Sequence, residues 1–266
     1  MMSPPSAGFR HAYAVQRAAE GRGYAAASQL ELPYMSAGPL AKQWSVRART
    51  YDALLSCVLR PMAAAIGRPL RLLDLGSGNG WLCWRVAGLG CKAVALDCRD
   101  DLVDGLGAAR AFLERGPRFE RVSASFEELP IANASFDVVT FSASLHYSLD
   151  LGRALQEACR VTRTGGRIAV LDSPFYSTEA NGAAMVSEKH RDAGRRFGAR
   201  AGVLLAPPFI EFLTRERLVR ASAALGLVWR RHRVRYPLWY ELRPVAAFLR
   251  RRRPPSRFDL WECTVA

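Results

Sequence analysis

The 266-residue sequence has little lysine and no long apolar run. Only Lys42, Lys92 and Lys189 are lysines, so arginine carries nearly all of the positive charge. No segment approaches the roughly 20 uninterrupted apolar residues that a membrane-spanning helix needs. The first residues lack the basic segment, apolar run and cleavage site of a secretory signal. These absences predict a soluble, cytoplasmic protein.

Cysteine and histidine are few and scattered. The six cysteines contain no Cys-x-x-Cys pair, and the four histidines share no ligand spacing. A zinc site requires such ligands in clusters, so we expect no metal. The cysteines are interpreted as reduced residues of the core.

Acidic residues are scarce near the end of the chain. Residues 230–257 contain ten arginines and one acidic residue, Glu241, which gives +9 of the total net charge of +14. This arginine-rich region is either a solvated surface or a binding surface for phosphates, anionic lipid headgroups or an acidic acceptor. No stacking aromatic residues mark a nucleic-acid module, so nucleic acid is disfavoured as a partner.

After Pro69 the sequence alternates between short apolar runs and helical runs. Strands are expected at 70–75, 92–96, 119–122, 136–141, 167–171, 227–236 and 258–265, with helices at 81–89, 102–113 and 151–161 among them. Alternation of this kind is typical of a parallel sheet with helices on both faces. The sequence therefore predicts an α/β fold with a Rossmann-like, doubly wound sheet of seven strands, mostly parallel, with an antiparallel C-terminal strand.

Capping residues support several helix boundaries. Asp100 or Asp101 and Asp150 stand where helix N-caps are expected, and Gly165-Gly166 stands where a helix should end. Residues 1–40 look irregular, whereas apolar spacing predicts a helix over 41–66 that Pro61 interrupts.

Breaks in these patterns divide the chain into four regions. We predict an N-terminal arm and lead-in helix over 1–67, a Rossmann-like core over 68–173, a substrate cap insertion over 174–213 and a completion of the core sheet over 214–266.

The strongest functional signal is the run Leu72-Leu73-Asp74-Leu75-Gly76-Ser77-Gly78-Asn79-Gly80-Trp81. A strand runs into a glycine loop there, at the sheet edge where open α/β folds bind ligands. The Gly-x-Gly-x-Gly spacing differs from that of a dinucleotide site. The carboxylate of Asp74 would repel a pyrophosphate but suits a sulfonium and an α-amino group.

This loop resembles the nucleotide-binding motif of class I S-adenosylmethionine-dependent methyltransferases. The likeness extends through Asp97 and through residues 126–130, 135–139 and 160–166, and it covers residues 41–173. Several ordered motifs at family spacing are far more specific than one glycine-rich turn. The sequence is similar to the small-molecule and quinone-methylating branch, the type 11 methyltransferases.

The resemblance implies roles for several residues. Gly76 and Gly78 would pass beneath the methionine part of S-adenosylmethionine, and Asp97 would hold both ribose hydroxyls. Cys98 would border the adenine, and Ser142 would offer its backbone to the methionine amine.

Ser125 departs from the family pattern, in which an acidic residue commonly contacts the adenine amino group. A hydroxyl can still accept that hydrogen bond, and the backbone N–H of Phe126 can donate to the ring. On the lead-in helix, either Arg47 or Tyr51 contacts the cofactor's carboxylate, or Tyr51 packs in the core and Arg47 is solvated.

Methyl transfer needs a base only when the acceptor carries a proton. His146, just beyond the fourth strand, is the best-placed candidate, and His190 and Tyr176 are weaker ones. A lone histidine near a strand end is more often a packing residue, so that alternative stays open.

The sequence thus predicts an enzyme that methylates an O, N or C atom of a small or lipid-like acceptor. One alternative is a catalytically weak, cofactor-binding regulatory protein, which only Ser125 favours. Another is a methyltransferase that acts on an anionic macromolecule through the arginine-rich region. The Asp172-Ser173-Pro174-Phe175-Tyr176 run lies after the wrong strand for a nucleobase methyltransferase, and no Pro-Cys dipeptide occurs. The acceptor and the oligomeric state are left open.

Overall fold

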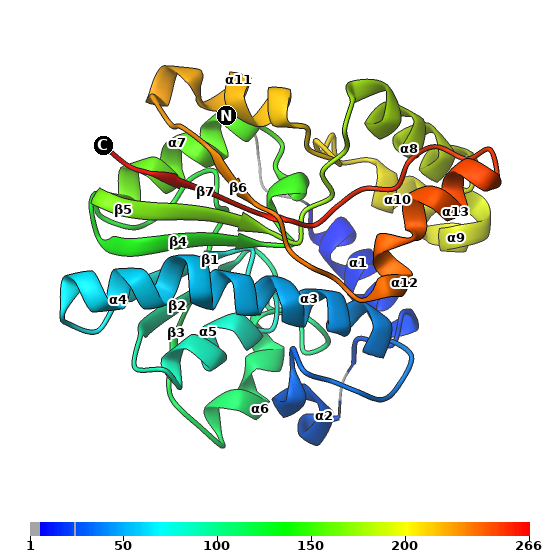
Figure 1. The fold of residues 1–266 in the computed structure, drawn as a ribbon. Coiled ribbons are helices and arrows are strands. Elements are labelled where there is room, and N and C mark those ends of the chain that lie inside the picture. Colours follow the sequence, from blue (N-terminus) through cyan, green and yellow to red (C-terminus); the bar gives the residue numbers. More distant parts are fainter. Residues whose placement is uncertain (1–5, 24) are drawn as a thin grey trace.

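The computed structural model describes residues 6–23 and 25–266 (Figure 1), so residues 1–5 and Tyr24 of the predicted N-terminal arm lie outside the described part. Seven strands form one sheet in the order β3-β2-β1-β4-β5-β7-β6. They are β1 (Arg71–Leu75), β2 (Lys92–Asp97), β3 (Glu120–Ser123), β4 (Phe136–Ser142), β5 (Thr162–Leu171), β6 (Arg230–His232) and β7 (Leu260–Thr264).

The first five strands pair in parallel, and β7 runs antiparallel to both β5 and β6. The predicted Rossmann-like sheet with an antiparallel C-terminal strand is confirmed. The strand order reverses between β1 and β4, which is the position where open α/β sheets leave a crevice for a ligand.

Helices cover both faces of the sheet (Figure 1). One face carries α3 (Ala41–Leu54), α4 (Arg60–Ile66), α5 (Trp81–Ala87) and α6 (Arg110–Leu113), and the other carries α7 (Leu151–Val161) and α11 (Arg215–Ser222). Successive strand residues point to opposite faces, so Leu72 and Val138 join one hydrophobic cluster while Leu73 and Val139 join the other. The core therefore consists of two apolar layers around one sheet.

The lead-in helix passes through Pro61 without breaking. A π-helical turn over Leu55–Leu59 joins α3 to α4, and Pro61 stands in the first turn of α4. In a regular α-helix the proline ring clashes with the carbonyl four residues earlier, and the wider π turn changes that spacing. Pro61 therefore does not end the helix. The π-helical turn accommodates the proline, and the helix continues to Ile66.

Two helices lie in the described part of the N-terminal arm, which corrects the expectation of irregular structure for residues 7–19 and 26–31. The arm contains α1 (Ala7–Ala19) and α2 (Ala26–Glu31), and the hydroxyl of Ser6 caps α1 by accepting a hydrogen bond from the backbone N–H of Phe9 at 3.2 Å. The buried side of α1 packs Phe9 against Leu204. Such a short apolar stripe is stable as a helix because another element covers it.

The remaining helices gather with α1 beyond the carboxyl ends of the parallel strands (Figure 1). They are α8 (Glu179–Arg191), α9 (Ala193–Phe197), α10 (Ala201–Leu205), α12 (Leu238–Glu241) and α13 (Arg243–Leu249). The first three lie within the segment predicted to be a cap. None of the helices formed by the described residues is long and apolar enough to cross a membrane.

Two of the predicted helix boundaries need correction. Asp150 caps α7 as expected, but Asp101 accepts hydrogen bonds from three backbone N–H groups of a turn, and the following helix begins only at Leu106. The glycine pair lies inside β5, because α7 already ends at Val161. At the end of α7 the hydroxyl of Thr162 donates to the carbonyl of Ala158 at 2.6 Å. This bond satisfies one of the free carbonyl groups of the last helical turn, where a glycine had been expected.

Candidate cofactor site

The glycine loop after β1 is held in a strained, tight turn. Gly76 and Gly78 have φ of 71° and 56°, in the region that favours glycine. The backbone N–H groups of Gly76 and Ser77 donate to the carbonyl of Leu96 at 2.8 and 3.0 Å, which ties the loop to β2. A Cβ on Gly76 would lie 2.4 Å from that of Ser144. Only glycine fits at this position.

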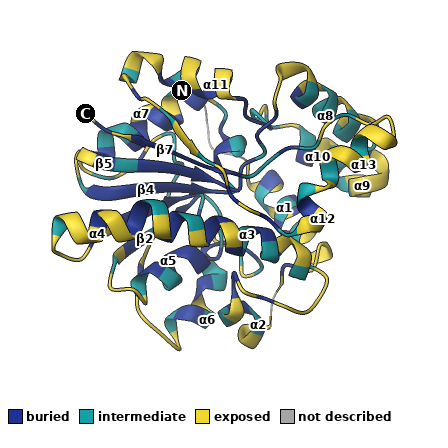
Figure 2. Ribbon diagram, viewed as in Figure 1, coloured by how far each residue is buried: buried dark blue, intermediate teal, exposed yellow. Residues whose placement is uncertain are grey.

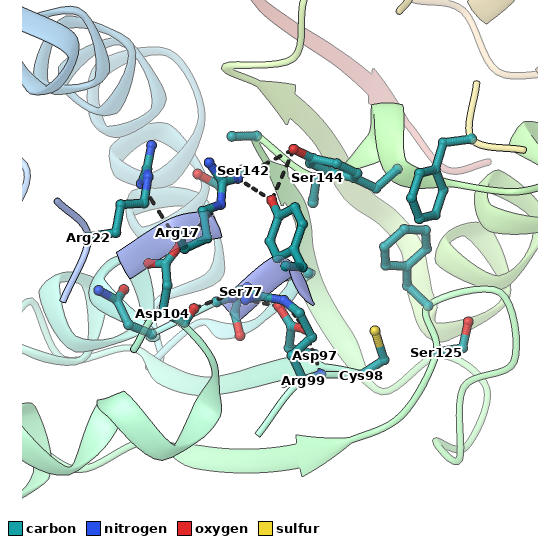
Figure 3. Close-up of a pocket in the computed structure, with 18 of the residues that line it drawn as sticks. Arg17, Arg22, Ser77, Asp97, Cys98, Arg99, Asp104, Ser125, Ser142 and Ser144 are labelled. Atoms are coloured by element: carbon teal, nitrogen blue, oxygen red, sulfur yellow. Dashed lines mark hydrogen bonds and ion pairs between the residues drawn. The ribbon is translucent and has the colours of Figure 1, made fainter. Parts of the chain in front are cut away.

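A cavity opens beside this loop, with about 950 Å³ of empty space, part of it open to solvent. Eight predicted residues line it: Arg47, Gly76, Gly78, Asp97, Cys98, Ser125, Phe126 and Ser142. They come from the lead-in helix, the glycine loop and the segments after β2, β3 and β4, so the fold brings separated motifs to one place (Figure 3).

Asp97 is a buried carboxylate at the end of β2. One oxygen accepts from the backbone N–H of Gly78 at 2.8 Å, and the other accepts from the N–H of Arg99 at 2.9 Å. The guanidinium of Arg99 lies 3.6 Å away. A carboxylate has about four acceptor positions, so this fixed group can still receive hydroxyl donors from the cavity.

Two serine hydroxyls in the cavity wall have no hydrogen-bond partner within the described part of the chain. They are Ser77 Oγ and Ser142 Oγ, and both are buried. A buried hydroxyl without a partner costs about 1–3 kcal/mol, so such groups point to a ligand that carries polar atoms. Together with Asp97, they suit a nucleoside joined to an amino acid.

Asp74 and Tyr51 lie behind the cavity wall and are not among the residues that line it, so their contact with a ligand stays a prediction. Asp74 accepts a hydrogen bond from the hydroxyl of Thr140 at 2.7 Å and so joins β1 to β4. Burial raises the pKa of Asp74 to about 7, and the charge of Asp97 adds to the shift. The ring of Tyr51 packs edge-on against Trp81, which does line the cavity.

An arginine cluster at one end of the cavity was not foreseen. Arg17 and Arg22 of the N-terminal arm approach the carboxylate of Asp104 at 3.7 and 4.0 Å. Arg99 donates to the backbone carbonyl of Asp104 at 3.1 Å. Figure 3 shows this cluster at the opposite end of the cavity from Ser125. No motif or spacing connects the arm to the loop after β2, so only the fold reveals the contact.

A second cavity, with about 970 Å³ of empty space, adjoins the first. The two share five lining residues: Phe9, Tyr13, Arg17, Tyr147 and Phe209. The hydroxyl of Tyr13 donates to that of Tyr147 at 3.0 Å, and Phe209 packs edge-on against both Phe9 and Tyr147. The two cavities therefore meet at a boundary that consists mostly of aromatic side chains.

His146 lines the second cavity and not the first. Its Nδ1 lies 3.4 Å from the hydroxyl of Ser173, and its ring rests against Tyr147 with centroids 4.3 Å apart. Burial, together with the charges of Arg17, Arg47 and Lys189, lowers the pKa of His146 to about 3. The imidazole is thus neutral at physiological pH, and the same shift makes it a weak base.

The two weaker candidates for a base differ in position. Tyr176 lines the second cavity, where its hydroxyl accepts a hydrogen bond from Arg253 at 3.1 Å. His190 lines neither cavity. Among the residues that the structure describes, no three His, Cys, Asp or Glu side chains are grouped as metal ligands would be.

Comparison with known proteins finds relatives of this chain among methyltransferases. Residues 73–170 match the family model described as "Methyltransferase domain". A ubiquinone/menaquinone biosynthesis C-methyltransferase of Methylobacterium nodulans is 32% identical over 127 residues, which is 47% of this chain and 49% of the relative. The chain thus spans about half the length of the curated relatives that it matches.

Two solved structures resemble the chain over nearly its whole length. A possible histamine N-methyltransferase of Thermotoga maritima has a TM-score of 0.54 at 15% identity, covering 97% of this chain and 100% of its own. The 1,6-didemethyltoxoflavin-N1-methyltransferase of Burkholderia thailandensis has a TM-score of 0.53 at 17% identity, covering 100% and 94%. At these identities the likeness concerns the fold. Residues 73–170 are thus similar to the methyltransferase domain family, and the chain shares the fold of these two methyltransferases.

Proposed function

We propose that this protein transfers a methyl group from S-adenosylmethionine, bound in the first cavity, to a small or lipid-like acceptor in the second. The observation that carries the proposal is that the two cavities adjoin and share part of their lining. The first has the polar groups for a nucleoside and an amino acid. The second is lined by six aromatic side chains, five charged side chains and the neutral His146. Methyl transfer requires the reacting atoms to lie about 3–3.5 Å apart, so the two ligands must meet at the shared boundary.

The residues of the first cavity fit the parts of the cofactor in order. Cys98, Ser125 and Phe126 suit the adenine, and the carboxylate of Asp97 suits the ribose hydroxyls. Burial raises the pKa of Cys98 to about 11, so its thiol is neutral beside the uncharged base.

The amino acid part of the cofactor fits the opposite end. Gly76 and Gly78 leave the backbone open beneath it, and the free hydroxyls of Ser77 and Ser142 offer it hydrogen bonds. Arg22 at that end is 3% exposed and carries the positive charge that a carboxylate needs.

When bound, the cofactor supplies a methyl group on a positively charged sulfur. That methyl group would pass to the acceptor atom, and the electron pair of the broken carbon–sulfur bond would stay on sulfur. The protein orients the acceptor and excludes water from the path. A proton on the acceptor oxygen or nitrogen would pass by way of His146, whose neutral ring lines the second cavity, and on to solvent, because a ring with a pKa of about 3 does not retain it.

The relative from Methylobacterium nodulans is named for methylation in quinone biosynthesis. A ring compound such as a quinone precursor would pack against the aromatic side chains of Phe9, Tyr147 and Phe209 in the second cavity. This supports a small, aromatic or lipid-like acceptor.

The test combines calorimetry with turnover. The protein should bind S-adenosylhomocysteine one to one, and S-adenosylmethionine should be converted to it in the presence of quinols, phenols, amines or prenylated rings. Binding without turnover on any acceptor would favour the regulatory alternative. Absence of binding would refute the proposal.

A further inference from the structure

An apolar ridge runs along α12 and α13. Six large hydrophobic side chains between residues 238 and 249 are exposed, which is nearly half of the thirteen such side chains within the described part of the chain. They are Leu238, Trp239, Leu242, Val245, Phe248 and Leu249. Leu238 and Phe248 are 73% and 81% exposed, respectively. Covering these side chains would remove apolar surface from water and so stabilise the protein, but no described part of the chain covers them.

The ridge is helical, and the buried Tyr240 of α12 anchors it to the protein. Backbone hydrogen bonds continue from α12 into α13 through Leu242, and the spacing of three to four residues puts the exposed side chains along one side. On the inner side Tyr240 is 2% exposed and packs against Tyr236 and Phe258. Figure 2 shows the outer side of α13 as exposed. The apolar side chains therefore project from a fixed base.

The arginine-rich region divides into a structural part and an exposed part. Arg257 pairs with Glu241 and Asp259, and Arg231 also pairs with Asp259. By contrast, residues 250–252 are three exposed arginines directly after the ridge, and no carboxylate of the described residues lies within ion-pair distance of them. Three positive charges thus border the apolar side chains.

The ridge is joined to the second cavity through Arg253. Its guanidinium pairs with Glu188 of α8 at 2.8 Å and donates to the hydroxyl of Tyr176, which lines that cavity. Figure 1 shows α13 beside the helices of the cap. Whatever binds the ridge therefore lies next to the cavity proposed for the acceptor.

We propose that the ridge of α12 and α13 docks the protein on an anionic phospholipid surface, beside which an apolar acceptor enters the second cavity. Helices with an apolar side bordered by arginines lie in the headgroup layer, with the apolar side chains inserted and the cations on the phosphates. A protein partner would need an apolar groove with acidic residues placed at one end. A membrane with anionic headgroups meets both requirements, the apolar one and the acidic one, without any such arrangement of residues. The docking stands on the ridge alone, and only the route of the acceptor rests on the proposed function.

Vesicle co-sedimentation of the full-length protein tests the docking. We expect at least about tenfold tighter binding to phosphatidylglycerol-containing vesicles than to phosphatidylcholine alone, and a decline with added salt. The double variant Phe248→Ser/Leu249→Ser should weaken binding about tenfold, as should Arg250→Gln/Arg251→Gln/Arg252→Gln. Binding of S-adenosylhomocysteine should stay unchanged in both variants.

Matched controls separate docking from general attraction by a basic protein. Val228→Ser removes an equally exposed apolar side chain elsewhere, and Arg110→Gln/Arg115→Gln/Arg118→Gln removes three exposed charges near α6. Both should bind vesicles like the wild type. Equal losses in controls and ridge variants would overturn the proposal, and so would absence of vesicle binding or dimerisation through the ridge. Failure of methyl transfer leaves these measurements unaffected, so the two proposals can fail separately.

Discussion

The first cavity is built mainly from one continuous stretch of chain, whereas the second is assembled from distant segments. Residues 76–144 supply most of the first wall, at the ends of neighbouring strands. The second wall combines α1, the segment after β4, the cap helices and the loop at Phe209. Sheet geometry fixes the first cavity, and side-chain packing between surface elements fixes the second. Substitutions outside the five residues that line both cavities should therefore affect cofactor binding and catalysis separately.

The largest expected effect is loss of the first cavity in Gly76→Val. The new Cβ would collide with Ser144 at 2.4 Å, and a β-branched residue is strained at a φ of 71°. We expect no cofactor binding detectable by calorimetry. Gly90→Val is the matched control, because Gly90 has a φ of 88° and no atom within 4 Å of an added Cβ. If Gly76→Val folds and binds normally, the loop does not form the site.

The next effect in size concerns the second cavity alone. His146→Gln should lower kcat by roughly 10²–10⁴-fold for a hydroxyl or amine acceptor, the range that general bases supply. Cofactor affinity should be unchanged, because His146 does not line the first cavity. His190→Gln, outside both cavities, is the control and should retain full activity. Near-normal turnover in His146→Gln would make this histidine a packing residue.

The dependence of kcat and of stability on pH gives a second test of the role of His146. Because the pKa of His146 is lowered to about 3, its ring stays neutral above that pH and adds no limb to kcat near its ordinary value of 6.5. Its effect falls on stability instead. The unfolded chain gains a proton that the folded one does not, so stability decreases as the pH falls from 6.5 towards 3, by up to about 1.4 kcal/mol per pH unit. Chemical denaturation should show a smaller decrease in His146→Gln.

Asp97→Ala should weaken cofactor binding by about 1.5–3 kcal/mol, because two ribose hydroxyls lose a charged acceptor. Asp100→Ala, an exposed carboxylate three residues later, is the matched control. Calorimetry on both variants measures the affinity for the cofactor, and their melting temperatures show whether the proteins remain folded. An unchanged affinity in a folded Asp97→Ala protein would remove this residue from the site.

The smallest expected effect is a gain. Ser125→Asp should tighten cofactor binding a few-fold, because a carboxylate accepts a stronger hydrogen bond from an amino group than a hydroxyl does. Ser123→Asp adds the same charge at an exposed position outside the first cavity and should change nothing. Weaker binding in Ser125→Asp would show that the adenine amino group lies elsewhere.

The sequence predicted the sheet and much of the first cavity because both depend on local patterns. Gly76, Gly78 and Asp97 lie at strand ends, and the ends of parallel strands meet at one edge. For Asp74 and Tyr51 the same reasoning did not predict the surroundings of the side chains. Asp74 accepts a hydrogen bond from Thr140 and Tyr51 packs against Trp81, and the periodicity of the sequence does not indicate these contacts.

The contribution of α1 lay beyond the reach of local patterns. Tyr13 and Arg17 meet Tyr147 across more than 100 residues of sequence, and their helix is covered only because the cap packs on it. A stretch rich in alanine carries little sign of such a contact. Packing between segments, rather than propensity, decides where these side chains lie.

The pairing of Tyr13 with Tyr147 has a thermodynamic consequence. One helix closes a side of both cavities, so any movement that withdraws Tyr13 alters the two at once. Occupants on either side of that wall then share a single opening equilibrium. A ligand that holds α1 in place from one side raises the affinity for a ligand on the other, and by reciprocity the second does the same for the first.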